Sequence, residues 1–136
     1  MKKVTTEQIV KAYQVLHDAK LGKLEGKEKI AVVKVSQKLK SVATAYTEFE
    51  QDAVKRLRPD GFDSIEQKLS SRSSLTPAES LKLQEFNKQV SECLEEEKKK
   101  EHELDIEPLS EKTMEHLMES NDFTIGQLIA IEEIMQ

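Results

Sequence analysis

The sequence predicts a mainly α fold: a long antiparallel helical hairpin with an N-terminal helix, two short C-terminal helices and one short edge strand near residues 103–107. Apolar residues recur at helical spacing over long stretches, and helix-capping patterns precede three of these stretches. Four glycines and three prolines are too few for a many-turned β sandwich or barrel. The 136 residues have the size of one domain, so we predict a single helical domain over residues 1–136 with a flexible connector at about 59–75.

The first helix is predicted to begin after Thr5, which can form a Thr-x-x-Gln capping box with Gln8. Val4 and Ile9 occupy the two positions of a hydrophobic staple, one before the cap and one at the fourth helical position. A loop rich in lysine and glycine follows at residues 21–27, and either Gly22 or Gly26 can supply the left-handed backbone that ends a helix.

The second helix has the clearest periodic pattern in the chain and is expected from about Lys27 to Arg58. Its apolar residues are three and four positions apart, which gives a near-heptad stripe on one face. The residues Pro59-Asp60-Gly61 then break the helix. The stripe consists of Val32, Val35, Leu39, Val42, Tyr46, Phe49, Ala53 and Leu57.

The third helix is expected to pair with the second helix after the connector reverses the chain. Within the connector, Phe62, Ile65 and Leu69 have the spacing of one or two helical turns, and a serine-rich loop follows. Thr76 can cap the third helix, with Pro77 at its first position and a glutamate closing the capping box. Its apolar stripe consists of Leu83, Phe86, Val90, Cys93 and Leu94.

The C-terminal part begins with apolar residues at every second position around Leu104 and Ile106, which predicts the short edge strand. Ser110 is expected to cap a short helix that reaches about Leu117. The last helix is predicted over residues 125–135. This pair is too apolar to remain uncovered, so we expect it to dock onto the hairpin or onto a neighbouring subunit. The side chains expected to face inward are Leu128, Ile129, Ile131 and Ile134.

The sequence contains no recognisable catalytic, cofactor-binding or metal-binding pattern, so we predict no enzyme, cofactor, metal site or small-molecule substrate. The three histidines are scattered and lack the spacing of zinc ligands. The glycines at 22 and 26 resemble part of a P-loop, but their spacing is one residue short and Glu28 occupies the Mg²⁺-binding position. No signal peptide or membrane-spanning stretch is evident, so we expect a cytoplasmic protein in the bacterial host cytosol, with no membrane partner.

The charge is unevenly distributed along the chain. Residues 1–40 hold ten lysines against four acids, a net charge of +6, whereas residues 41–136 hold eleven basic residues against twenty-two acids, a net of −11. These halves can attract each other, within one molecule or between copies, or the basic part can bind nucleic acid. The candidate basic surface contains no aromatic residue to stack on bases. It consists of Lys20, Lys23, Lys27, Lys34, Lys38 and Lys40.

In its layout the chain resembles a family of small, functionally uncharacterised helical proteins of tailed phages and prophages. The matching segments are residues 20–23 (Lys-Leu-Gly-Lys), 38–40 (Lys-Leu-Lys), 104–109 (Leu-Asp-Ile-Glu-Pro-Leu) and 123–128 (Phe-Thr-Ile-Gly-Gln-Leu). The resemblance covers nearly the whole chain as a pattern. It implies a phage-related context, and it transfers no enzyme activity and no functional residues.

Together these observations predict a non-catalytic helical protein for protein–protein interaction or assembly, of phage or prophage type, with a protein partner or self-association. The alternative is a nucleic-acid-associated protein that uses the Lys20–Lys40 surface.

Overall fold

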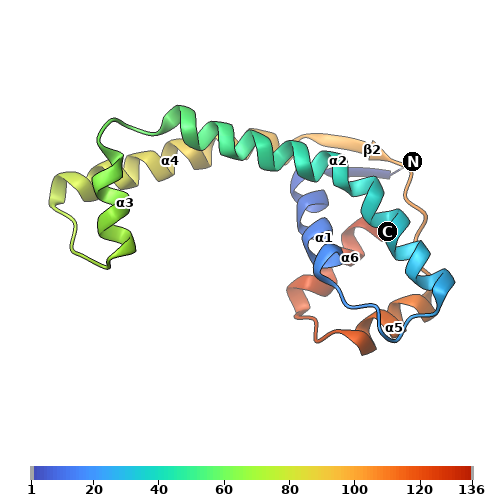
Figure 1. The fold of residues 1–136 in the computed structure, drawn as a ribbon. Helices are drawn as coiled ribbons and strands as arrows, with labels where there is room; N and C mark the ends of the chain where they lie inside the picture. Colours follow the sequence, from blue (N-terminus) through green and yellow to red (C-terminus); the bar gives the residue numbers. More distant parts are fainter. Residues whose placement is uncertain (1, 136) are drawn as a thin grey trace. The chain divides into compact units, whose positions relative to one another are not determined.

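The computed structural model describes residues 2–135, which form six helices and one antiparallel sheet of two strands (Figure 1). The predicted mainly α class, with one long helix and a short edge strand, is confirmed. In chain order the elements are β1 (Lys2–Thr5), α1 (Thr6–Asp18), α2 (Gly26–Leu57), α3 (Phe62–Ser70), α4 (Pro77–Lys99), β2 (Glu101–Leu104), α5 (Glu111–Ser120) and α6 (Ile125–Met135).

The chain divides into two compact units. The first comprises residues 1–46 and 98–136, and the second comprises residues 47–97. The long helix α2 contributes its N-terminal part to the first unit and its last turns to the second. The expectation that residues 1–136 form a single domain therefore stays a prediction.

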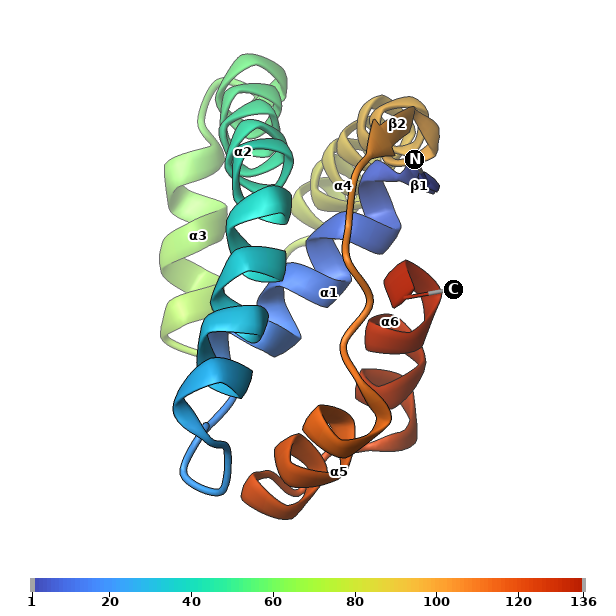
Figure 2. The ribbon, with the colours of Figure 1, turned by 90° about the vertical axis from the view of Figure 1, so that its right-hand side faces the viewer.

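The small sheet joins the two ends of the first unit. β1 and β2 are antiparallel, with a register that runs from Lys2 opposite Leu104 to Thr5 opposite Glu101. The strand expected near residues 103–107 is therefore displaced toward the N-terminus, and residues 105–110 are extended without strand pairing (Figure 2). The reason is that Lys2, the first described residue of β1, lies opposite Leu104, so no described residue of β1 remains to pair with the residues after Leu104. The pairing strand β1 was not predicted.

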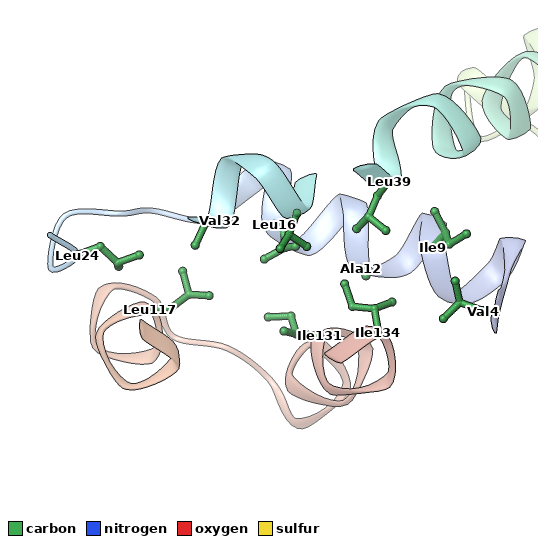
Figure 3. Packing of buried hydrophobic residues seen from close by; sticks show 11 residues of the cluster. Val4, Ile9, Ala12, Leu16, Leu24, Val32, Leu39, Leu117, Ile131 and Ile134 are labelled. Carbon is green, nitrogen blue, oxygen red and sulfur yellow. The ribbon is translucent and has the colours of Figure 1, made fainter. Parts of the chain in front are cut away.

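The core of the first unit forms where α1, α6 and the N-terminal part of α2 meet (Figure 3). The stripe predicted for α2 supplies Val32, Val35 and Leu39, which are all buried. From α6, Ile131 and Ile134 point into the same cluster (Figure 3). The first unit combines the lysine-rich residues 1–46 with the acidic residues 98–136. Together these two segments hold fourteen lysines and fourteen acids.

Helix starts in this chain follow local capping chemistry. Thr5 and Gln8 form the predicted capping box: the Gln8 N–H donates to Thr5 Oγ1 at 3.2 Å, and the Thr5 N–H donates to Gln8 Oε1 at 3.0 Å. Ser110 caps α5 as expected, through a hydrogen bond from the Thr113 N–H. A further reciprocal pair, Thr124 with Gln127, starts α6 and was not predicted.

In the second unit, the end of α2 and α4 form an antiparallel hairpin. The guanidinium of Arg56 donates to Cys93 Sγ at 3.3 Å, and Lys82 Nζ donates to the Asp60 carbonyl at 3.3 Å. The expected connector contains the nine-residue helix α3, whose side chains Phe62 and Ile65 are buried.

The prediction of one core residue in α6 is wrong. Ile129 was expected to face inward, but it is 48% exposed, and Ala130 is buried in its place. The physical reason is that the apolar residues of α6 are spread around the helix and its amphipathicity is weak, so their spacing does not indicate which side faces the core.

Candidate functional site

The first unit contains an open groove of about 910 Å³ between α2 and the segment that runs from Asp105 into α5. This size lies within the range of ligand-binding sites in proteins. One side is formed by successive turns of the N-terminal part of α2. The other side is formed by residues 105–110 and the first turn of α5, and Figure 2 shows this extended segment on its way from β2 to α5.

The α2 side of the groove is basic. Lys27, Lys34 and Lys38 are seven and four residues apart, so their side chains leave the helix on one face. All three are exposed. Beneath them, Val35 is buried and Ala31 is half-buried, which gives this side an apolar base.

The opposite side carries acidic groups. Asp105 and Glu107 are exposed, while Ile106 between them is half-buried and packs against the core. This alternation is typical of an extended backbone, in which successive side chains point to opposite faces. Within residues 2–135 these two carboxylates form no ion pair with Lys34 or Lys38, so the charged sides of the groove do not close on each other.

The structure divides the predicted basic surface. Three of its six lysines, Lys27, Lys34 and Lys38, line the groove, whereas Lys20, Lys23 and Lys40 lie outside it. The backbone N–H groups of Lys20 and Lys23 donate to Asn121 Oδ1 and Ser120 Oγ, so these residues hold their loop against α5 and its C-terminal end.

Sequence reasoning missed one lysine of the groove. Lys112 is in the first turn of α5, far along the chain in its acidic part, so it did not belong to the basic segment. One signal in the sequence was available: Lys112 follows the predicted Ser110 cap by two residues, which places it in the first turn of the predicted helix. The groove thus combines four lysines with carboxylates from both of its sides.

A buried polar cluster closes the α5 end of the groove around Glu28, which is only 5% exposed. The Glu25 backbone N–H donates to its Oε1 at 2.9 Å, and His116 Nδ1 lies 2.7 Å from the same oxygen. Thr113 Oγ1 donates to Oε2 at 3.2 Å. Because an ionised carboxylate only accepts hydrogen bonds, Nδ1 of His116 carries a proton.

These contacts favour the ionised form of Glu28. The hydrogen bond from the Glu25 N–H, followed by those from His116 and Thr113, lowers the pKa of this carboxyl, against the opposing effect of burial. Both carboxylate oxygens are engaged by the protein itself. The arrangement therefore suits a positioning role, in which Glu28 connects the start of α2 to α5, better than proton transfer to a substrate.

A second surface of interest is the outer face of α6. Ile125 is 78% exposed and Ile129, one turn later, is 48% exposed. Ile134 follows Ile125 by about two and a half turns, so it lies on the opposite side of the helix, where it is fully buried. α6 therefore presents isoleucines both to the core and to solvent.

The described residues show neither a metal-binding cluster nor a membrane-spanning helix. No three His, Cys, Asp or Glu side chains in the described part of the chain are grouped so that they could hold a metal ion. Likewise, none of the helices in residues 2–135 is both long and apolar enough to cross a lipid bilayer.

Comparison with known proteins gives no relative. No protein-family model matches the chain, and neither a curated protein nor a solved structure is significantly similar to it.

Proposed function

We propose that this chain is a non-catalytic helical protein for protein–protein interaction or assembly, and that the outer face of α6 joins it to a second copy. The observation that carries the proposal is the pair of exposed isoleucines, Ile125 and Ile129, on a helix whose other side is already buried. The engaged state of Glu28 supports a non-catalytic role, because the buried carboxylate has no unoccupied oxygen to offer a substrate.

Most residues of α6 are apolar, including residues on its exposed side. A helix that contacts its own protein on one face and water on the other is normally amphipathic, whereas a helix that is apolar all round is normally covered on both faces. Exposed Ile125 and Ile129 on adjacent turns place two apolar side chains on the outer face of α6, next to the exposed Glu132 and Glu133. Burial of an isoleucine side chain contributes about 1.5–3 kcal/mol, so its coverage by another protein surface is favourable.

A second copy is the partner that fits this pair of isoleucines best. Two α6 helices related by a twofold axis present the same apolar surface to each other, as isologous dimers do. The first unit carries equal numbers of lysines and acids, so the units of two copies approach each other without a net electrostatic penalty. Apolar character and electroneutrality together support self-association through α6.

The test is sedimentation velocity over a range of concentrations. The wild-type chain is expected to form dimers or higher oligomers, and the double substitution Ile125→Glu with Ile129→Glu is expected to give monomers. Ile30→Glu is the matched control, because Ile30 on α2 is 58% exposed but lies away from α6 in sequence and on another helix. A monomeric wild-type chain at all concentrations would refute the proposal, as would dimers that survive both α6 substitutions.

A second candidate function is association with nucleic acid through the basic side of the groove. The observation in its favour is the alignment of Lys27, Lys34 and Lys38 on one face, with Lys112 across the groove. Such binding would depend on phosphate contacts and weaken steeply with salt. Retardation of a DNA or RNA probe at low salt, lost in the Lys34→Glu, Lys38→Glu variant, would favour this function over the first.

We also propose a phage or prophage context and a location in the bacterial host cytosol. The support for the context is the pattern of residues 20–23, 38–40, 104–109 and 123–128. Identification of the genes that flank this one tests the context directly, because neighbouring packaging or tail genes would define the assembly in which the protein takes part.

A further inference from the structure

We infer that the groove between α2 and residues 105–113 binds an extended segment of a partner protein, which is added as a β-strand beside residues 105–107. This segment carries acidic and basic side chains in alternation. The groove is a different surface from the outer face of α6. A test of peptide binding in the groove therefore does not decide whether the chain self-associates through α6.

The backbone of residues 105–107 is extended and unpaired in the described part of the chain. The ladder between β1 and β2 ends at Leu104, and in residues 2–135 the N–H groups of Asp105, Ile106 and Glu107 donate to no acceptor. The chain remains extended there, in continuation of β2. An extended backbone with unused N–H and C=O groups is the feature that strand-adding peptides recognise, since main-chain hydrogen bonds provide much of their affinity.

The two sides of the groove carry opposite charges. Exposed lysines line the α2 side, and exposed Asp105 and Glu107 line the other. In an extended peptide, successive side chains point to opposite faces. A peptide of alternating acids and bases therefore turns its acids toward Lys34 and Lys38 and its bases toward Asp105 and Glu107, which gives favourable pairs on both sides.

The carboxylates of the groove make a polyphosphate chain a less favourable occupant than a peptide that carries both charges. Asp105 and Glu107 line the side opposite the lysines of α2 and would repel a nucleic acid backbone where it passes them. Glu25 and the ionised Glu28 add negative charge at the α5 end. A ligand that carries both signs satisfies these groups, whereas a ligand with negative charge alone satisfies only the lysines.

Hydrogen exchange of the full-length chain, followed by NMR, tests the mode of binding. The probe is a peptide of about eight residues, within the usual length of a strand, in which Glu and Lys alternate. Its matched control contains the same residues as a block of Glu followed by a block of Lys, so net charge and composition are unchanged. The alternating peptide is expected to slow amide exchange at one or more of residues 105–107, and the block peptide is expected to have no such effect.

Charge reversal tests the contribution of α2. The Lys34→Glu, Lys38→Glu variant is expected to bind the alternating peptide about tenfold more weakly or worse, as measured by fluorescence anisotropy. The Lys20→Glu, Lys40→Glu variant changes the net charge equally but lies outside the groove, so its affinity should equal that of the wild type. Circular dichroism spectra of both variants establish that their helices are intact.

Three outcomes would overturn the inference. The first is the absence of binding by the alternating peptide. The second is binding without protection of residues 105–107, which would place the peptide elsewhere. The third is a nucleic acid probe that binds through Lys34 and Lys38 and is not displaced by the peptide, which would assign the groove to phosphate. None of these outcomes bears on self-association through α6.

Discussion

Glu28 and His116 are 88 residues apart in the sequence, yet Oε1 of the glutamate lies 2.7 Å from Nδ1 of the histidine. Glu28 belongs to the first turn of α2, and His116 belongs to α5. With Thr113 they hold α5 against the start of the long helix, next to the groove. Because a buried polar group is costly without hydrogen-bond partners, the loss of any of these three donors should weaken the attachment of α5 to α2.

The first prediction concerns the pH dependence of stability. Because the pKa of Glu28 is lowered in the folded chain, its ionised form stabilises the fold above the pKa of the unfolded state, and this contribution disappears as the pH falls through the folded value. Urea unfolding of the wild type and of Glu28→Gln at a series of pH values should therefore show a stability difference at neutral pH that shrinks in acid.

The control for this experiment is Glu115→Gln, which changes an exposed carboxylate on α5, the helix that Glu28 of α2 contacts. This variant should retain the pH dependence of the wild type. A stability difference between wild type and Glu28→Gln that stays constant from neutral pH to acid would show that the ionised carboxylate is not what holds α5.

Elements that depend on local chemistry were predictable from the sequence. The capping boxes at Thr5 and Thr76 rely on residues three positions apart, and both form in the structure. The near-heptad stripe of α2 also predicted its buried face, because helical spacing alone decides which side chains share a side. Thr124 and Gln127 have the same spacing as the other two boxes, so this start of α6 was equally readable.

The second prediction uses this capping box. Thr124→Ala removes the hydroxyl that accepts the Gln127 N–H at 3.2 Å, so it should lower the free energy of unfolding by about 1 kcal/mol. Thr124→Ser retains the hydroxyl and should retain most of the stability. Thermal unfolding of the two variants measures the difference, and equal losses in both would mean that the threonine acts through its methyl group.

Elements that depend on distant parts of the chain were not predictable from local patterns. β1 becomes a strand because β2, nearly a hundred residues later, supplies its partner. Burial of Glu28 depends on Thr113 and His116 in the same way. One signal was present: Glu28 lies one helical turn before the buried Val32, so the apolar stripe of α2 continues toward the N-terminus through Glu28.

The third prediction compares two isoleucines on opposite sides of α6. Ile134→Ala leaves a cavity in a fully buried site, so it should lower the free energy of unfolding by about 2–5 kcal/mol. Ile125→Ala, at a largely exposed site on the same helix, should change the stability of the monomer by less than about 0.5 kcal/mol. Denaturant unfolding at low concentration measures both, and a similar loss in both variants would contradict the assignment of the inner and outer faces.

In the second unit, an ion pair connects α3 to the start of α4. Lys68 Nζ lies 2.6 Å from Glu79 Oε1, and the same oxygen accepts the Thr76 N–H at 2.9 Å. The hydrogen bond from Lys68 is the larger cause, and with the Thr76 N–H it lowers the pKa of Glu79 to about 2 from an ordinary 4.5. Glu79 thus serves both the capping box of α4 and its attachment to α3.

The fourth prediction is that Lys68→Met raises the pKa of Glu79 but does not restore its ordinary value. The substitution removes the larger stabilising contact, while the Thr76 N–H still favours the ionised carboxylate. The contribution of this group to stability is present above pH 4.5 and is lost as the pH falls toward about 2, so the variant should lose part of it at a higher pH. A carboxyl ¹³C NMR titration measures the pKa directly. Lys82→Met is the control, because Lys82 contacts the Asp60 carbonyl instead. An unchanged pKa in Lys68→Met would show that the cap alone lowers it.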